Sequence, residues 1–204
     1  MPLRDRPGTV FRYGGPALQI AGALVEQATG KTWAQLFEER LGRPLGMTHT
    51  AWGNPLWPAM PPSAIHNPNL QGGAVTTADD YGKFLTMLDA GGVYGGRRIL
   101  SARSVALMEH VQTRGARIAF TPAGAAGAAL QYGFGNWCEA VEAGGACSIV
   151  SSPGAFGTYP WIDRRHDLYG LFFMRRRLPL VERDIQAARR IIVRAAAGAT
   201  PHAG

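Results

Sequence analysis

Helical spacing dominates the first half of the chain. Between Pro16 and Gly30 the apolar residues recur every three or four positions, which places them on one face of a helix. Proline in the first turn and glycine just past the end mark the limits of this helix. A second helix is expected to follow at once and to end before Arg43. The expected N-caps of the second, third and fourth helices are Thr32, Thr77 and Ser101.

Beyond residue 115 the pattern changes to short apolar runs separated by turns. Runs with the length and flanking residues of strands occur at residues 132–140, 147–152, 155–163 and 167–174. Residues 181–197 return to helical spacing with one apolar stripe. This order predicts an α+β fold, in which a C-terminal helix covers one face of an antiparallel sheet. We expect a mainly helical part at 1–114 and a part with the strands and the last helix at 115–204.

Residues 48–75 show no periodic pattern and are rich in proline, asparagine and glycine. A loop of this length inside a compact domain commonly has a function. Its tryptophans, with aromatic residues of the strands, are candidates for the lining of an apolar cleft, and packing in the core is the alternative for each. These residues are Trp52, Trp57, Tyr159 and Trp161.

Composition limits the classes of function. Apolar residues make up 46% of the chain and charged residues 17%, so the chain can bury a core. No apolar run approaches the roughly 20 residues that span a bilayer, so no membrane span is expected. The net charge is +7, and its densest arginine group lies at 175–194, where the solvated face of a helix is the interpretation that we favour. Without a recognised motif, no nucleic-acid partner is expected.

The two cysteines flank a predicted turn, and two cysteines alone make no metal site. Cys138 and Cys147 stand on either side of EAVEAGGA, which has the composition of a hairpin tip. Opposed positions of a hairpin lie within disulfide reach, so a bridge and two free thiols both stay open. No cofactor or metal motif is present: GKT at 30–32 lacks the earlier glycine of a phosphate loop, and no histidine pair has the spacing of a zinc site.

Three blocks of sequence resemble one enzyme family in the same order. They are FRYGGPALQIAGALVEQATGKTWAQLFEERLGRPLGMTHT, GGAVTTADDYGKFLTML, and YGFGNW followed by SSPGAFGTYPWIDRRHDLYGLFF. They resemble the serine β-lactamase-related hydrolases, which include class C β-lactamases, D,D-peptidases and family VIII-type esterases. The resemblance covers roughly residues 8–195. It implies a β-lactamase/transpeptidase-like fold.

The resemblance also implies acyl transfer to or from a small ester or amide, without a cofactor. In such enzymes a serine attacks a carbonyl, and a lysine and a tyrosine handle the proton. Tyr13 takes the place of the tyrosine in the family's Tyr-x-Asn motif, and Gly15 stands where the asparagine would be. Residues Ser152–Gly154 match the third motif, and the N–H of Ala155 would be the oxyanion donor. The glycines after Tyr13 are expected to let the loop turn sharply.

The family's S-x-x-K motif is absent from these 204 residues. Three residues before Lys31 and Lys83 stand Ala28 and Asp80. We therefore expect an incomplete fold: the C-terminal portion of a longer enzyme, inactive alone, with an unpaired sheet edge that favours self-association. The alternative is a non-catalytic module that keeps the ligand-binding cleft of this fold.

Overall fold

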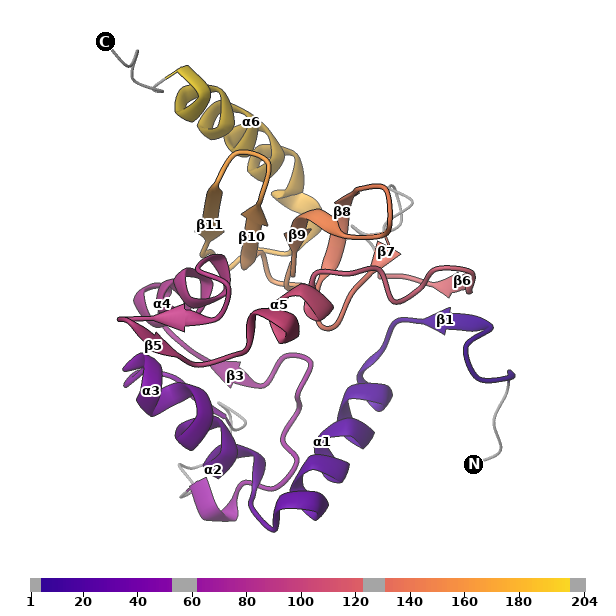
Figure 1. The fold of residues 1–204 in the computed structure, drawn as a ribbon, viewed down its shortest axis with the longest axis vertical. Helices are drawn as coiled ribbons and strands as arrows, with labels where there is room; N and C mark the ends of the chain where they lie inside the picture. Colours follow the sequence, from indigo (N-terminus) through magenta and orange to yellow (C-terminus); the bar gives the residue numbers. More distant parts are fainter. Residues whose placement is uncertain (1–4, 53–61, 123–130, 199–204) are drawn as a thin grey trace. The chain divides into compact units, whose positions relative to one another are not determined.

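Figure 1 shows the computed structural model, which describes residues 5–52, 62–122 and 131–198. Contacts divide the chain into two compact units, Tyr13–Ser101 and Met1–Arg12 with Ala102–Gly204. The expected parts, 1–114 and 115–204, followed the change of pattern along the chain, whereas these units follow contacts in space. We call them the helical unit and the sheet unit.

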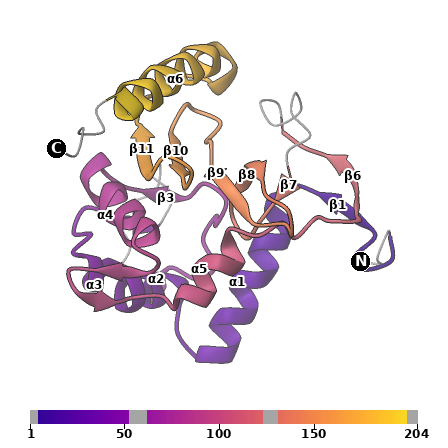
Figure 2. The same cartoon turned by 45° about the horizontal axis from the view of Figure 1, so that its top comes forward.

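The helical unit is built from helices, which Figure 2 shows, and two small antiparallel strand pairs. Its helices are α1 (Gly15–Thr29), α2 (Trp33–Phe37), α3 (Arg43–Leu45) and α4 (Ala78–Asp89). Its hairpins pair β2 (Ala51–Trp52) with β3 (Ala74–Val75) and β4 (Val93–Tyr94) with β5 (Arg97–Arg98). The hairpin β2–β3 closes the long loop that the sequence shows between residues 48 and 75.

The predicted helix boundaries are confirmed at three caps. Gly30 ends α1 in the left-handed conformation with φ 67°, which glycine adopts without steric cost. Thr32 forms a capping box with Gln35, in which each side chain bonds the other's backbone N–H. Thr77 accepts a hydrogen bond from the N–H of Asp80 at the start of α4.

The second helix is longer than predicted. It continues from α2 through a π-helical turn, Glu38–Gly42, into α3, and ends at Gly46. The expected end before Arg43 was wrong because the π-helical turn, in which the N–H of Arg43 bonds the oxygen of Glu38, carries the helix on to Pro44. The left-handed Gly46, with φ 66°, supplies the actual stop.

The sheet unit contains one antiparallel sheet in the order β11-β10-β9-β8-β7. These strands are β7 (Gln131–Tyr132), β8 (Trp137–Val141), β9 (Cys147–Ser151), β10 (Tyr159–Asp163) and β11 (Leu168–Phe172). Outside the sheet, β1 (Val10–Arg12) pairs in parallel with β6 (Arg117–Phe120), as Figure 2 shows. β6 lies in a segment for which no strand was predicted, and the helix α5 (Ala102–Met108) precedes it.

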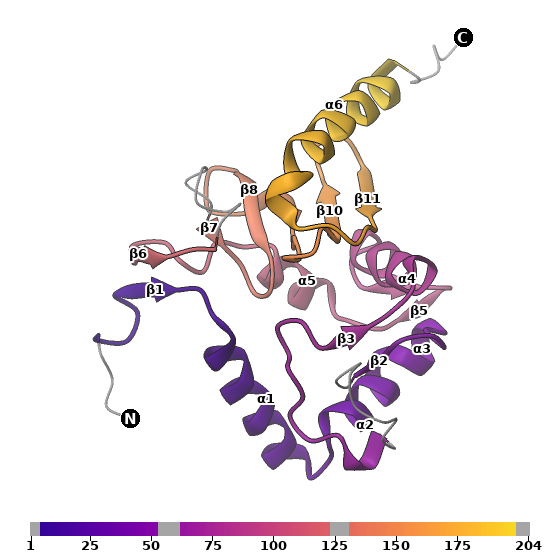
Figure 3. The ribbon, with the colours of Figure 1, turned by 180° about the vertical axis from the view of Figure 1, so that it is seen from behind.

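The helix α6 (Glu182–Gly198) packs against the sheet, as the α+β prediction requires (Figure 3). The core beneath it is formed by Tyr159, Trp161, Leu178 and Ile185. Ile185 is 1% exposed, but Ile192, on the same predicted stripe, is 41% exposed. Only the first half of the stripe is therefore covered.

Among the strands that the structure describes, β7 and β11 are the outer strands of the five-stranded sheet. Self-association through a sheet edge stays a prediction, which the concentration dependence of the molecular mass in solution would test. Within the described ranges, no helix combines the length and apolar character needed to cross a membrane.

Candidate active site

Tyr13 lies between β1 and α1 and is half-buried. Gly14 is the N-cap of α1 and has an extended backbone with φ 166°, while Gly15 is already helical. Neither glycine adopts the left-handed conformation that favours glycine. The expected sharp turn was therefore wrong, because one extended residue is enough to lead from the strand into the helix.

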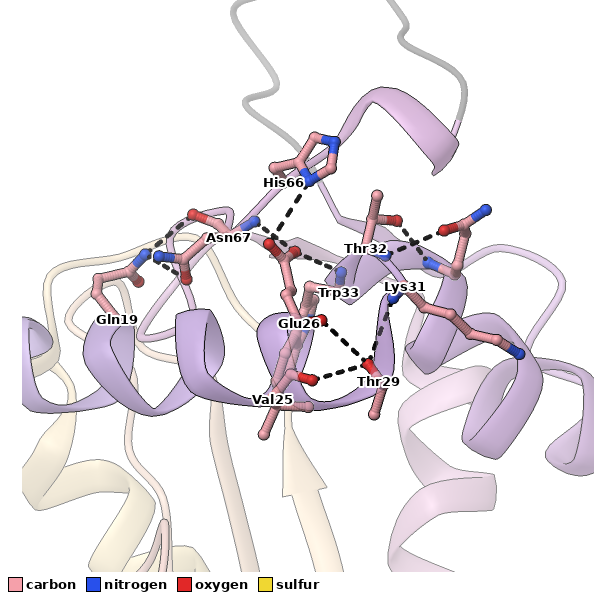
Figure 4. Close-up of polar contacts among 10 residues, drawn as sticks. Gln19, Val25, Glu26, Thr29, Lys31, Thr32, Trp33, His66 and Asn67 are labelled. Atoms are coloured by element: carbon pink, nitrogen blue, oxygen red, sulfur yellow. Dashed lines mark hydrogen bonds and ion pairs between the residues drawn. The ribbon is translucent and has the colours of Figure 1, made fainter.

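Glu26 of α1 holds the segment that follows residue 65 (Figure 4). Its Oε1 accepts hydrogen bonds from the backbone N–H of Asn67 at 2.7 Å and of Trp33 at 2.6 Å. The Nδ1 of His66 lies 3.6 Å from Oε2 of the same carboxylate. Burial would raise the pKa of Glu26, but these donors stabilise the carboxylate and bring its pKa below the ordinary value.

Gln19, two turns earlier on α1, holds the next part of the same segment. Its Nε2 donates to the backbone oxygens of Asn67 at 3.0 Å and Pro68 at 2.9 Å. Its Oε1 accepts from the N–H of Leu70 at 2.7 Å. We call residues 66–70 the strap, because α1 side chains bond it along its length.

Gln71 follows the strap and reaches the beginning of α1. A Cβ atom built on Gly15 would lie 2.8 Å from Oε1 of Gln71, so the carboxamide occupies the space beside that glycine. Gln71, Gln19 and Glu26 were not predicted from the sequence as site residues. No pattern in the chain marked the strap, because its contacts join residues about 50 positions apart.

The predicted third motif forms a loop after β9, in the sheet unit. The N–H of Ser152 donates to the backbone oxygen of Pro160 at 3.1 Å, and the N–H of Gly154 donates to that of Thr158 at 2.7 Å. These bonds continue the pairing of β9 with β10 beyond the sheet. The exposed Ser152 donates its Oγ hydrogen to the backbone oxygen of Gly135 at 3.3 Å.

Ala155 is exposed at the tip of this loop, which we call the tip loop and define as residues 152–158. Its carbonyl oxygen accepts a hydrogen bond from the N–H of Leu178 at 2.9 Å, which ties the tip loop to the segment before α6. Its own N–H donates no hydrogen bond to any of the described residues. An unoccupied amide on a backbone fixed in this way is the geometry that an oxyanion donor needs.

Both lysines are already bound to carboxylates. Lys31 Nζ lies 2.5 Å from Glu39, and Lys83 Nζ lies 2.8 Å from the buried Asp80. The hydrogen bond that Lys83 donates to the carboxylate of Asp80 raises the pKa of Lys83 despite partial burial. A lysine that acts as a base needs a lowered pKa, so Lys83 is unsuited to that role.

Two other tyrosines are poor candidates for proton transfer. Burial raises the pKa of Tyr81 to about 12. Burial, and then the nearby carboxylate of Glu139, raise the pKa of Tyr159 to about 12. Both phenols stay protonated at neutral pH. Tyr159 also donates its hydroxyl hydrogen to Glu139 at 2.7 Å, in contact with α6 rather than in a cleft.

The remaining sequence candidates fall into structural positions. Cys138 and Cys147 form a disulfide between β8 and β9, with their Cα atoms 5.2 Å apart. Trp52 packs edge-on against Trp33, and Trp161 is 3% exposed beneath α6. For both residues the structure favours packing against other side chains over the lining of a cleft. Trp57 lies outside the described residues.

A shallow hollow of the sheet unit is lined in part by Thr113, Gln131 and Glu142 and includes none of the predicted site residues. No group of three metal-ligating side chains occurs within the described ranges. The structure thus places Tyr13 and Gly15 in the helical unit, and Ser152, Gly154 and Ala155 in the sheet unit.

The comparison with protein families decides the ancestry of this arrangement. A family model described as beta-lactamase matches residues 1–195 of the chain. The chain belongs to the beta-lactamase family. This membership agrees with the mixed fold and with the order of the motifs.

Named beta-lactamase relatives support the same assignment. A crystal structure of a candidate beta-lactamase from Bacteroides dorei DSM 17855 superposes with a TM-score of 0.73 and 39% identity, over 86% of this chain and 53% of that one. A candidate D-alanyl-D-alanine carboxypeptidase of Escherichia coli K12 is 37% identical over 71 residues, which are 35% of this chain and 16% of that protein. Penicillin-binding protein 4 of Amycolatopsis lactamdurans is 33% identical over 126 residues, which are 50% of this chain and 32% of that protein. The chain thus spans at most about half the length of these relatives.

Proposed function

We propose that this chain supplies part of a serine hydrolase site that transfers the acyl group of a small amide or ester through an acyl-enzyme. Tyr13 handles the proton, and the N–H of Ala155 binds the oxyanion. The hydroxyl of Ser152 would turn its hydrogen from the backbone oxygen of Gly135 to the substrate, beside Gly154. The carboxypeptidase and the penicillin-binding protein among the relatives favour amides of the D-alanyl peptide type.

One observation carries this proposal: the unoccupied N–H of Ala155 on a fixed loop. An oxyanion donor must be in place before negative charge develops on the substrate, because it then costs no reorganisation during the reaction. The tip loop meets this requirement, since hydrogen bonds hold it at Ser152, at Gly154 and at the carbonyl of Ala155.

The chain by itself is proposed to form no acyl-enzyme. It contains no S-x-x-K motif, and Lys31 and Lys83 are engaged with carboxylates. The attacking serine and its lysine would come from a polypeptide segment that carries this motif. The absence of the motif also favours the second candidate function, a module that binds the ligand without converting it.

Labelling separates the two functions. A fluorescent penicillin and a fluorophosphonate should leave no covalent adduct on the chain alone. When the chain is combined with the S-x-x-K segment of a family member, an adduct should form on that segment's serine if the chain supplies the rest of a catalytic site. A binding module would hold the penicillin reversibly and give no adduct in either case. A covalent adduct on the isolated chain would contradict the proposal.

Two substitutions assign the roles in the combined protein. Ala155→Pro removes the proposed oxyanion N–H and should lower the acylation rate about 100-fold or more. Tyr13→Phe removes the hydroxyl and should lower the rate by about 100-fold or more. Tyr94→Phe, another half-buried tyrosine of the helical unit, is the matched control and should leave the rate unchanged. Equal rates for all three variants would exclude these roles.

A further inference from the structure

The carboxamide of Gln71 is a polar group without an assigned role. Its Oε1 lies against Gly15, the first residue of α1 and the second residue after Tyr13. Gln71 is exposed, and its side chain makes no hydrogen bond to any of the described residues. A carboxamide has two N–H donors and an oxygen acceptor, so it can bind an amide group of a ligand at two points.

The backbone that leads to Gln71 is fixed along the whole strap. Glu26 bonds it at Asn67, and Gln19 bonds it at Pro68 and Leu70. On the far side of Gln71, the N–H of Gly73 donates to the backbone oxygen of Asn69 at 2.6 Å, which closes a tight turn around the residue. The backbone entropy for presenting the carboxamide is therefore lost on folding, and the side-chain torsions of Gln71 are what remains to be ordered when a ligand binds.

Position 15 and Gln71 compete for one space. The 2.8 Å between a Cβ on residue 15 and Oε1 of Gln71 is closer than real Cβ contacts allow, so any side chain at residue 15 would displace the carboxamide. Glycine at position 15 leaves this space to the carboxamide, and its backbone, which is helical, does not itself require glycine. The carboxamide of Gln71 thus takes the place of a side chain at residue 15.

We propose that Gln71 is a substrate-positioning residue, whose carboxamide hydrogen-bonds a peptide-type amide of the substrate next to Tyr13. This inference rests on the proposed function. It narrows the substrate class to molecules that carry an amide for this contact, in preference to plain esters.

The test measures reversible binding of N-acetyl-D-alanyl-D-alanine to the 204-residue chain by calorimetry. Gln71→Met keeps the length of the side chain without its amide and should weaken binding about 10-fold, as expected for one lost hydrogen bond. Gly15→Ala should weaken binding similarly by displacing Gln71, although alanine favours the helix and should not lower the melting temperature. The double variant Gly15→Asn with Gln71→Gly moves the carboxamide to residue 15 and should recover most of the affinity.

The outcomes distinguish this inference from the proposed function. If the wild-type chain binds the dipeptide and Gln71→Met binds it equally well, the inference fails and the proposed function stands. If the wild-type chain binds neither the dipeptide nor benzylpenicillin, the inference fails, whereas the proposed function is decided separately by adduct formation in the combined protein. A loss of affinity that follows a loss of melting temperature in Gln71→Met would show a structural role and would also overturn the inference.

Discussion

The strap leads to the candidate residue Gln71 and the tip loop carries the candidate residue Ala155, but the two segments are held by different forces. Side chains of α1 hold the strap through hydrogen bonds to its backbone, and the key acceptor, Glu26, is charged. Backbone hydrogen bonds hold the tip loop as an extension of the sheet, and the apolar core beneath α6 lies next to it in the chain. We infer that the strap can open locally and that the free energy of this opening depends on the protonation of Glu26. The tip loop, in contrast, loses its structure only when the sheet unit unfolds.

The largest expected effect tests the core of the sheet unit. Ile185 is 1% exposed in α6, and Ile185→Ala should lower the free energy of unfolding by about 4 kcal/mol through lost burial and a cavity. Ile191→Ala on the same helix is the matched control, because Ile191 is 65% exposed, and it should cost under about 0.5 kcal/mol. Chemical denaturation measures both. Similar losses in the two variants would show that α6 is not packed as described.

A second variant tests the ion pair between Arg189 of α6 and Glu139 of the sheet. Arg189 is 7% exposed, lies 2.7 Å from Glu139, and stacks 5.0 Å from the ring centroid of Trp161. Arg189→Ala should cost about 3 kcal/mol, since it leaves a partly buried carboxylate without its cation. The neighbouring Arg190 is exposed, so Arg190→Ala should be close to neutral. A neutral Arg189→Ala would mean that the pair contributes nothing net.

The third-largest expected effect is the loss of stability when the disulfide is reduced. Cys138 and Cys147 close a loop with a sequence separation of 9 residues between two paired strands. Reduction should lower the free energy of unfolding by about 2.5 kcal/mol, because the unfolded chain regains the entropy of the open loop. The melting temperature with and without a reductant measures this effect. The strap should keep its hydrogen-exchange protection in the reduced protein, since its contacts lie in the other unit.

The smallest expected effect tests the strap and its dependence on pH. The pKa of Glu26 is lowered in the folded state, so its contribution is complete above the unfolded pKa of about 4.3 and is lost as the pH falls through the folded value. Glu26→Gln should remove this pH dependence and speed hydrogen exchange at the Asn67 amide about 10-fold, equivalent to roughly 1 kcal/mol.

Glu38→Gln is the control for this measurement, because Glu38 lies outside the strap contacts and pairs only with Arg43 at 3.6 Å among the described residues. It should leave the exchange of the Asn67 amide unchanged. Faster exchange across the sheet unit in Glu26→Gln would remove the distinction between local and global opening.

Local signals in the sequence were enough for much of the fold. The caps Gly30, Thr32 and Thr77 and the run of strands after residue 130 follow from residue type and spacing within a few positions. The family resemblance likewise depends on ordered blocks of residues that are visible in one dimension. The parallel pair of β1 and β6 was not visible, because its partners are more than 100 positions apart and both strands are short.

The sequence alone determined which residue types are present: a tyrosine before a helix, a glycine in the third motif, and no S-x-x-K. Only the tertiary structure decided how they are held. The strap binds α1 through contacts between distant positions, and Gln71 fills the space beside Gly15. The N–H of Ala155 finds no acceptor in the part of the chain that the structure describes. Periodicity reports the faces of single elements, whereas these features arise where separate segments meet and compete for the same donors and the same volume.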